Sequence, residues 1–303
     1  MKNPKVSIIT PLFQSEKYIQ RYIDSIIAQN YDNIELILVN DGCTDNTDKI
    51  VEENRSKLEG SGINLVYIKQ ENKGIAGAVE TGLKVFNGKY LMWVDYDDIL
   101  FSDYIKTKVD FMEKNPDCKM CISPVLVVFE DDIDTIVGVR ERKIKNNQAD
   151  SLFFDLIIEK SPILLSICHF IDAEAFLTVN PKREIYHSRI GQNWQILLPM
   201  AYNFKAGYID KPLAKYVVRS ESVSHARKNM SIYFNNCKKI LINTLKSIEM
   251  PEKERLYYIN LVNYKYRRVF LSRIFKIHMN FRRKIFSLKI LGWDFDIYRG
   301  CDG

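Results

Sequence analysis

Residues 88–98 read Gly-Lys-Tyr-Leu-Met-Trp-Val-Asp-Tyr-Asp-Asp, an apolar run that ends in three carboxylates within four positions. The run at 90–94 predicts a buried strand. Asp95, Asp97 and Asp98 repel one another unless a cation neutralises them, and carboxylate oxygens suit Mg²⁺ or Mn²⁺. The alternative is an Asp-rich turn that caps the next helix. A metal site is favoured if neighbouring segments are also strands of one sheet.

Strand and helix patterns alternate upstream of this segment. Short apolar runs predict three more strands, at 6–10, 34–39 and 65–68. Apolar residues at helical spacing, or capping residues, predict the helices between them, near 19–27, 45–58 and 76–86. This order favours right-handed crossovers and a mostly parallel sheet. Ligands of such sheets bind where the strands end, and here those ends are polar or acidic, so we expect a nucleotide site.

The composition is that of a folded globular protein. The chain holds 303 residues, 46% of them hydrophobic and 27% charged, which excludes collagen-like and disordered chains. No uncharged apolar run approaches the roughly 18 residues of a membrane helix, and the N-terminus lacks a signal-peptide pattern. We therefore expect a soluble, cytoplasmic protein without a disulfide framework. Cys118 and Cys121 are interpreted as strand residues, because zinc needs more ligands than this pair.

The distribution of charge divides the chain near residue 230. Residues 231–303 hold 15 basic and 6 acidic side chains, a net charge of +9, whereas the whole chain carries +6. Between 264 and 289 there are nine basic residues, no acidic one and several aromatic rings. The pattern fits a solvated helical face, a surface that docks on anionic lipid, or phosphate contacts with nucleic acid. We expect a helical segment and no nucleic acid, with an anionic membrane surface as the candidate partner.

Four segments carry a family resemblance in order and spacing. They are Lys5-Val-Ser-Ile-Ile-Thr-Pro-Leu-Phe, Val39-Asn-Asp-Gly-Cys-Thr-Asp-Asn-Thr, Asn72-Lys-Gly-Ile-Ala-Gly-Ala-Val-Glu-Thr-Gly-Leu and Gly88-Lys-Tyr-Leu-Met-Trp-Val-Asp-Tyr-Asp-Asp. Together they resemble the family-2 glycosyltransferases with a GT-A fold, of the type that builds bacterial surface polysaccharides. The resemblance covers residues 5–115 and weakens afterwards.

The resemblance implies an α/β architecture of the GT-A type, in which a Rossmann-like, mostly parallel sheet with flanking helices binds the nucleotide. We expect a glycosyltransferase domain at 1–230, with a nucleotide-binding half at 1–115 and an acceptor half at 116–230. The basic segment 231–303 is expected to follow as a helical appendage.

The resemblance also implies roles for single residues. The nucleotide-binding residues that it implies are Pro11, Phe13, Asp41, Lys73, Gly74 and Asp95. Among these, Asp41 would accept the N3–H of uracil, a bond that a carboxylate makes well. Asp97 would bind the Mn²⁺ or Mg²⁺ that bridges the two phosphates, and His225 would complete the metal site. Such a cation stabilises the negative charge on a departing nucleoside diphosphate.

The sequence departs from the family in the helix that starts near Gly74. Val79-Glu80 stands where the family often carries Arg-Asn. One phosphate or ribose contact is therefore missing, or Lys73 supplies it.

A second departure concerns the general base. An inverting transferase needs a carboxylate to deprotonate the acceptor hydroxyl, yet Gln192-Asn193 stands in the place of the family's Glu-Asp. Either Asn193 only orients the acceptor while another carboxylate takes the proton, or turnover is lost. The candidate catalytic residues are Gln192, Asn193 and Asp98, and the candidate substitutes for the base are Asp172, Glu174 and Glu184.

The sequence thus predicts a metal-dependent glycosyltransferase. It would move a sugar from a nucleoside diphosphate, UDP above all, to a glycan or lipid-linked acceptor with inversion. A lipid-linked acceptor would place the protein peripherally on the inner face of the membrane. The alternative is a catalytically inactive subunit that binds a sugar nucleotide or a glycan. A nucleotidyltransferase is disfavoured, because the opening strand lacks a glycine-rich, basic phosphate loop.

Overall fold

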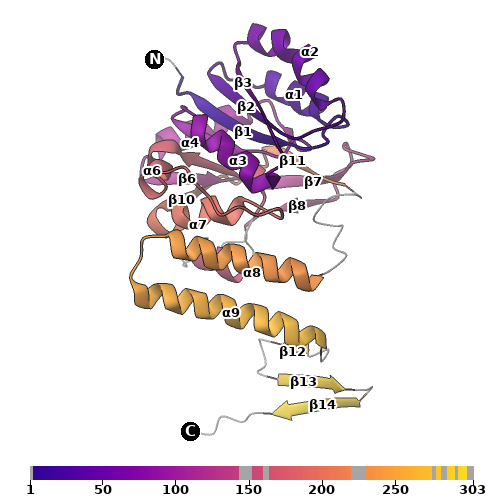
Figure 1. Ribbon diagram of the computed structural model, residues 1–303, viewed down its shortest axis with the longest axis vertical. Coiled ribbons are helices and arrows are strands. Elements are labelled where there is room, and N and C mark those ends of the chain that lie inside the picture. The colour runs from indigo at the N-terminus through magenta and orange to yellow at the C-terminus, as the bar shows by residue number, and fades with distance from the viewer. Residues whose placement is uncertain are drawn as a thin grey trace.

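The computed structural model describes most of the chain as one α/β body followed by two long helices and a small sheet (Figure 1). The described residues are 3–142, 152–159, 164–219, 230–274, 278–280, 285–290 and 293–298. Within the last helix and the small sheet, side chains beyond Arg267 are not described.

A seven-stranded sheet forms the centre of the body, in the order β10-β6-β9-β4-β1-β2-β3. Its strands are β1 (Val6–Leu12), β2 (Ile34–Asp41), β3 (Asn64–Gln70), β4 (Tyr90–Trp93), β6 (Cys118–Ile122), β9 (His169–Asp172) and β10 (Lys205–Tyr208). β9 runs antiparallel to β4 and to β6, and every other neighbouring pair is parallel. The predicted mostly parallel sheet is therefore confirmed, and Cys118 and Cys121 lie in a strand as expected.

Three helices link the four strands that the sequence predicts. They are α1 (Ile19–Ile27), α2 (Thr47–Gly60) and α3 (Gly74–Val85). α1 packs against α2, while α3 covers β1 and β2. With right-handed crossovers, the β3–α3–β4 connection reverses direction across the sheet and places α3 on the face opposite α1 and α2. The carboxyl ends of β1, β2 and β4 consequently meet at one edge.

The chain after β4 adds further helices and a second sheet. The helices are α4 (Tyr104–Lys114), α5 (Leu152–Ile158), the short 3₁₀ helix η1 (Ser166–Cys168), α6 (Ala173–Val179) and α7 (Asn193–Asn203). The second sheet has the order β5-β11-β7-β8, formed by β5 (Ile99–Leu100), β11 (Ala214–Val218), β7 (Val125–Phe129) and β8 (Gly138–Arg140). Because β5 follows the acidic turn directly and pairs with β11, the end of β11 is brought next to that turn.

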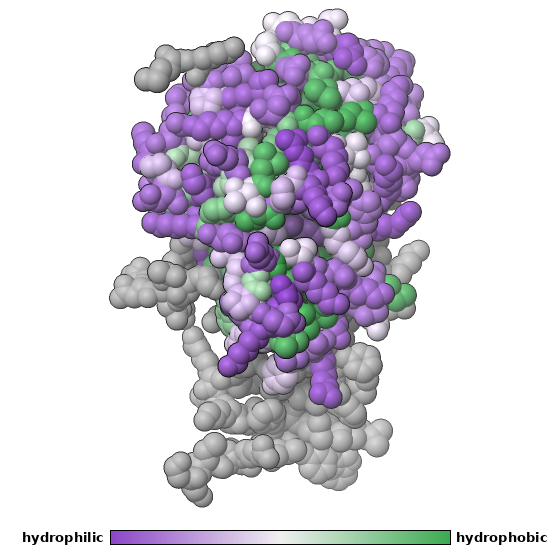
Figure 2. Space-filling model, turned by 60° about the vertical axis from the view of Figure 1, so that its left-hand side comes forward, coloured by the Kyte–Doolittle hydropathy of each residue, from purple (hydrophilic) through white to green (hydrophobic). Residues whose placement is uncertain are grey.

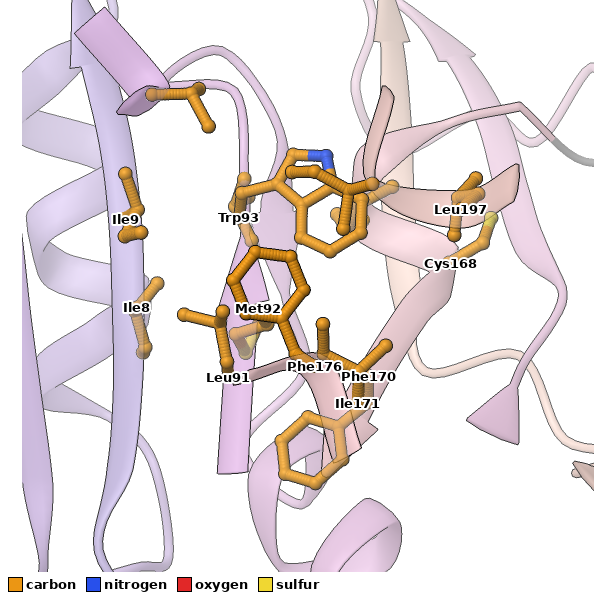
Figure 3. Packing of buried hydrophobic residues seen from close by; sticks show 14 of the residues in the cluster. Ile8, Ile9, Leu91, Met92, Trp93, Cys168, Phe170, Ile171, Phe176 and Leu197 are labelled. Carbon is orange, nitrogen blue, oxygen red and sulfur yellow. The ribbon is translucent and has the colours of Figure 1, made fainter. Parts of the chain in front are cut away.

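The core lies between the central strands and the helices that cover them. Figure 3 shows Ile8 and Ile9 of β1, Met92 and Trp93 of β4, and Phe170 of β9 gathered in one cluster. All five side chains are at most 1% exposed, and burying such a side chain is worth about 1.5–3 kcal/mol. Tight packing around β4 fixes the position of the acidic turn that follows it.

The C-terminal part begins with two long helices, α8 (Met230–Ser247) and α9 (Glu252–Ile274), which pack on each other and, through α8, on α7. These helices were predicted. The antiparallel sheet β12 (His278–Asn280), β13 (Ile285–Ile290) and β14 (Trp293–Tyr298) was not. The strict alternation of apolar and acidic residues in Trp293-Asp-Phe-Asp-Ile is a strand period, and the sequence interpretation gave the basic charge more weight than that period.

The surface in Figure 2 is hydrophilic over most of the α/β body, with hydrophobic side chains in a narrower band. None of the helices in the described ranges combines the length and the apolar character that crossing a bilayer requires.

Candidate active site

A cavity of about 440 Å³ opens at the carboxyl ends of β1, β2 and β4. One wall comes from these strand ends and from the start of α3. The other comes from residues 165–166, from 189–193, from the end of β11 and from Tyr233 of α8. Proteins place small-molecule sites at this edge of an α/β sheet. Of the residues predicted to bind nucleotide, the wall includes Pro11, Phe13, Asp41, Gly74 and Asp95.

Asp41 ends β2 and is only 2% exposed. Its Oδ1 accepts hydrogen bonds from Gln70 Nε2 at 2.7 Å and from the backbone N–H of Lys73 at 2.8 Å. These two donors hold one carboxylate oxygen and leave Oδ2 for the cavity. Phe13 lies at the same edge with 49% of its surface exposed, as an open apolar surface beside a fixed carboxylate.

The start of α3 explains why glycine is needed at position 74. Gly74 has a φ of +78°, and a Cβ at this position would lie 3.0 Å from Cγ of Arg189. The Lys73 side chain is exposed and is not part of the cavity wall; the structure uses its backbone N–H instead. Arg189, which the sequence interpretation did not select, enters the wall above Gly74.

The departure at Val79-Glu80 has a structural role. Val79 is fully buried. Glu80 Oε2 accepts a hydrogen bond from the backbone N–H of Ile185 at 2.7 Å, and Oε1 lies 3.0 Å from His187 Nε2. α3 thus uses these positions to dock the segment that delivers Arg189 to the cavity.

The acidic turn supplies three carboxylates with three different environments. Asp95 Oδ2 accepts a hydrogen bond from Ser166 Oγ at 3.2 Å, and Asp97 Oδ2 lies 2.7 Å from Arg219 Nε. Both line the cavity. Asp98 is 1% exposed, is not part of the wall, and accepts a hydrogen bond from the Val217 backbone N–H at 3.2 Å. Asp98 therefore joins the turn to β11 and does not face a ligand.

Burial raises the pKa values of all three acids, and neighbouring aspartates add to the rise at Asp95 and Asp98. Burial, followed by the charge of Asp97, raises the pKa of Asp95 to about 7. Burial raises the pKa of Asp97 even though Arg219 opposes it, and burial with the two neighbouring charges raises the pKa of Asp98 well above its usual value. The three carboxylates of the turn outnumber the two guanidinium groups that act on it, those of Arg219 and Arg21, so an added cation would be favourable.

The oxygen donors fit a hard divalent cation. Asp95 and Asp97 both present carboxylates to the cavity, and Mg²⁺ or Mn²⁺ is commonly held by one or two carboxylates with water and phosphate oxygens. Within the described ranges, no three His, Cys, Asp or Glu side chains are grouped as a complete metal site. His225, the predicted third ligand, falls in 220–229, outside the described residues.

Arg219 was not predicted. Its guanidinium lies 4.9 Å from the ring centre of Tyr18 and 5.6 Å from that of Tyr96 while it pairs with Asp97. The available signal was a basic residue at the end of a strand-like run, Tyr216-Val-Val-Arg. That strand meets the acidic turn by pairing with β5 and through the hydrogen bond from Val217 to Asp98, tertiary contacts that no local pattern reveals.

Asn193 begins α7 and uses both ends of its amide within the protein. Its Oδ1 accepts a hydrogen bond from Trp93 Nε1 at 2.6 Å, and its Nδ2 donates to the backbone carbonyl of Leu164. Asn193 thereby ties α7 to the end of β4 and to the segment before η1. An aspartate could accept from Trp93 but could not donate to the carbonyl, which accounts for an amide at this position.

The three candidate substitutes for the base lie away from the cavity. Asp172 caps α6 by accepting a hydrogen bond from the Ala175 backbone N–H at 2.9 Å. Glu174 is exposed, and Glu184 Oε1 pairs with Lys84 Nζ at 3.2 Å. None of the three belongs to the cavity wall, whose carboxylates among the described residues are Asp41, Asp95 and Asp97.

Comparisons with known proteins agree with this geometry. A family model described as glycosyl transferase family 2 matches residues 7–216. Glycosyltransferase GlyA of Streptococcus pneumoniae is 41% identical over 103 residues, 34% of this chain and 14% of that protein. The minor teichoic acid biosynthesis protein GgaB of Bacillus subtilis is 26% identical over 276 residues, 88% of this chain and 29% of that protein. The chain therefore spans well under half the length of these relatives.

Solved structures share the fold at low sequence identity. TarS 1-349 of S. aureus in complex with UDP-GlcNAc has a TM-score of 0.65 and 21% identity, over 86% of this chain and 72% of that chain. The mannosyltransferase PcManGT of Pyrobaculum calidifontis, in complex with GDP-Man and Mn²⁺, has a TM-score of 0.57 and 14% identity, over 90% of this chain and 76% of that chain. Both likenesses support a GT-A fold.

Proposed function

Because the chain belongs to glycosyl transferase family 2, we propose that it transfers a sugar from a UDP-linked donor, with a divalent metal and with inversion. The acceptor is a glycan or a lipid-linked glycan of bacterial surface polysaccharide synthesis. The names of GgaB and of the UDP-GlcNAc complex of TarS support this choice of donor and acceptor.

One observation carries the proposal: a fixed carboxylate and an acidic turn face the same cavity. Asp41, held by Gln70 and Lys73, offers an oxygen to the N3–H of uracil. Asp95 and Asp97 line the cavity beyond it, where the diphosphate would lie. A volume of about 440 Å³ falls within the range of roughly 300–1,000 Å³ that is typical of ligand sites.

The residues of this chain divide the work of the transfer. Asp41 and Phe13 orient the nucleobase, and Arg219 and Arg189 add positive charge to the cavity wall. Asp95 and Asp97 would hold Mn²⁺ or Mg²⁺, which supplies charge stabilisation for the departing UDP. The acceptor oxygen forms a bond to the anomeric carbon while the bond from that carbon to the phosphate oxygen breaks, and UDP keeps the electron pair. Gln192 and Asn193 are amides and do not take the acceptor's proton, which passes to water in the cavity.

The test measures UDP release from a panel of nucleotide sugars, with Mn²⁺ or Mg²⁺ and with chelator. We expect metal-dependent release from one UDP-sugar. In Asp97→Asn the rate of release should fall about 10²–10³-fold, because the cation that stabilises the leaving group loses one of its carboxylate ligands. Asp134→Asn is the matched control, since the Asp134 side chain is 94% exposed outside the cavity.

Two results would contradict the proposal. Undiminished turnover in a folded Asp97→Asn protein would refute the metal assignment. Binding of UDP without turnover of any donor, with or without acceptor glycans, would instead favour the inactive binding subunit.

The proposal extends to location. The basic and aromatic segment 264–289 would hold the enzyme on the cytoplasmic face of an anionic membrane, at about 1 kcal/mol per basic residue near the surface. The chain should sediment with vesicles that contain anionic lipid at low salt and be released at high salt. Equal sedimentation with neutral vesicles would remove the membrane from the proposal.

A further inference from the structure

Gln192 and Asn193 are neighbouring amides at the start of α7, and they differ in their hydrogen bonding. Both ends of the Asn193 side chain are hydrogen-bonded within the protein, to Trp93 Nε1 and to the Leu164 carbonyl. Gln192 is also buried, with 2% of its surface exposed, and lies in the wall of the cavity. Its side chain has no hydrogen-bond partner among the described residues and does not cap its own helix.

A buried amide without a partner is unusual, because most buried polar side chains are hydrogen-bonded. Gln195, three residues along the same helix, is tied to the protein through one end of its amide: its Nε2 donates to the backbone carbonyls of Tyr186 and Gly191, while its buried Oε1 has no hydrogen-bond partner among the described residues. The free amide of Gln192 therefore needs a partner that enters the cavity from outside the protein.

The space beside Gln192 is open. A Cβ built on Gly191, the preceding wall residue, would have no heavy atom within 4 Å. The segment crosses the cavity from Arg189, above Gly74, to Asn193, which is bound to the end of β4. Gln192, the residue before Asn193, consequently lies in the part of the wall next to the end of β4.

The uncharged amide of Gln192 favours an uncharged polar ligand. The side chain offers one carbonyl acceptor and two N–H donors without charge. Hydroxyl groups, which donate and accept at once, match this set. Phosphates would instead bind to the guanidinium groups of Arg189 and Arg219 in the same wall.

We propose that Gln192 is a specificity-determining residue that binds adjacent hydroxyl groups of a sugar ring in this cavity. The inference rests on the proposed function and goes beyond it, because it names the residue that reads the sugar. A site built to hydrogen-bond hydroxyl groups discriminates against ligands that present them wrongly, since its buried polar atoms are then left unpaired.

The experiment compares UDP with UDP-glucose, UDP-galactose, UDP-GlcNAc and UDP-GalNAc by calorimetric titration, in the presence of Mn²⁺. Wild type should bind one UDP-sugar more tightly than UDP. Gln192→Leu, which is close in size, should bind UDP within about twofold of wild type and lose about 5- to 150-fold in affinity for that UDP-sugar. Gln192→Glu, which keeps an acceptor, should recover part of the loss.

Gln195→Leu is the matched control, because Gln195 is not part of the cavity wall and its Nε2 is bound to backbone carbonyls. It should lower the melting temperature and change the affinities for UDP and UDP-sugar by the same factor. A parallel assay measures UDP release in the presence of methyl glycosides of glucose, galactose and N-acetylglucosamine as acceptors.

The outcomes separate the inference from the proposed function. A loss confined to the UDP-sugar assigns the hydroxyl groups to the transferred sugar, and a rise confined to the KM of the methyl glycoside assigns them to the acceptor; both support the role of Gln192. Unchanged constants in Gln192→Leu, or an equal loss for UDP and UDP-sugar, overturn that role. Failure of wild type to bind UDP at all would contradict the proposed function itself.

Discussion

The two walls of the cavity differ in how the chain builds them. The nucleotide wall comes from the ends of β1 and β2, the acidic turn after β4 and the start of α3, so its functional side chains lie within a few positions of a strand end. The opposite wall, at 165–166 and 189–193, comes from loops and a helix start. Its position depends on distant contacts such as the hydrogen bond between Trp93 and Asn193, which are 100 residues apart. The comparison separates a wall specified by local sequence from one specified by packing.

The largest expected effect in this comparison is at Asp41, on the nucleotide wall. In Asp41→Asn, Oδ1 still accepts from Gln70 and Lys73, so an amide nitrogen replaces the oxygen that would accept the hydrogen bond from uracil. The amide N–H introduced at position 41 and the N3–H of uracil are then both donors, and they repel each other. We expect the affinity for UDP to fall about 10- to 150-fold, because a hydrogen bond to a charged group is worth about 1.5–3 kcal/mol. Calorimetric titration measures it.

The same variant offers an internal control. Cytosine presents an acceptor at N3, so the amide nitrogen introduced by Asp41→Asn would suit CDP better than the carboxylate does. The preference for UDP over CDP should therefore shrink while the melting temperature stays near that of wild type. Unchanged affinity for UDP would show that Asp41 does not read the base, and the nucleotide wall would lose its best-defined residue.

The nucleotide wall was largely predictable from the sequence, for physical reasons. Buried parallel strands have continuous apolar runs, and ligands collect where such strands end. Asp41, Asp95 and Asp97 were therefore selected from the sequence, and the structure brings all three to one cavity. Lys73 was selected as well, although its backbone rather than its side chain takes part.

The opposite wall was not predictable to the same extent. Nothing in the sequence near Arg219 shows that β11 pairs with β5, and nothing near Arg189 shows that Glu80 docks its segment on α3. The pair Gln192-Asn193 was noticed because it lacks a carboxylate. Its division into one structural amide and one free amide depends on Trp93 and Leu164, which only the folded chain brings together.

A smaller effect is expected at Asn193 and tests whether packing defines the second wall. Asn193→Asp keeps the acceptor for Trp93 Nε1 but turns a carboxylate toward the Leu164 carbonyl. We expect the free energy of unfolding to fall by about 1–3 kcal/mol and turnover not to rise. Urea denaturation and UDP release measure the two quantities.

Asn180→Asp is the control for this substitution. Asn180 Nδ2 also donates to a backbone carbonyl, that of Glu184 at 2.9 Å, but at the surface. Asn180→Asp should lower the free energy of unfolding by no more than about 0.5 kcal/mol. A gain of turnover in Asn193→Asp would show that position 193 lies where a base can act, and the difference between the two walls would then be chemical rather than structural.

The smallest expected effect concerns a buried charge beneath the second wall. Lys108 of α4 is fully buried; its Nζ donates to the Cys168 carbonyl at 2.8 Å and lies 4.8 Å from the ring centre of Tyr104. Burial lowers the pKa of Lys108 below 10.5. Between the lowered pKa and 10.5, the unfolded chain binds the proton that the folded chain lacks, so this group makes the free energy of unfolding increase with pH.

Lys108→Met removes this contribution and keeps the length of the side chain. Urea denaturation of both proteins at pH 8, 9 and 10 should give a difference, wild type minus variant, that rises with pH by at most about 1.4 kcal/mol per unit. Burial raises the pKa of Tyr104 and of Cys168, and raises that of Cys121 to about 11. Those groups lower stability at alkaline pH in both proteins, so the difference isolates Lys108. Parallel curves would mean that the ammonium group is as well solvated when folded as when unfolded. The Cys168 carbonyl, which precedes β9, would then be hydrogen-bonded to an ammonium group that water reaches. The second wall would in that case be less tightly packed than its contacts indicate.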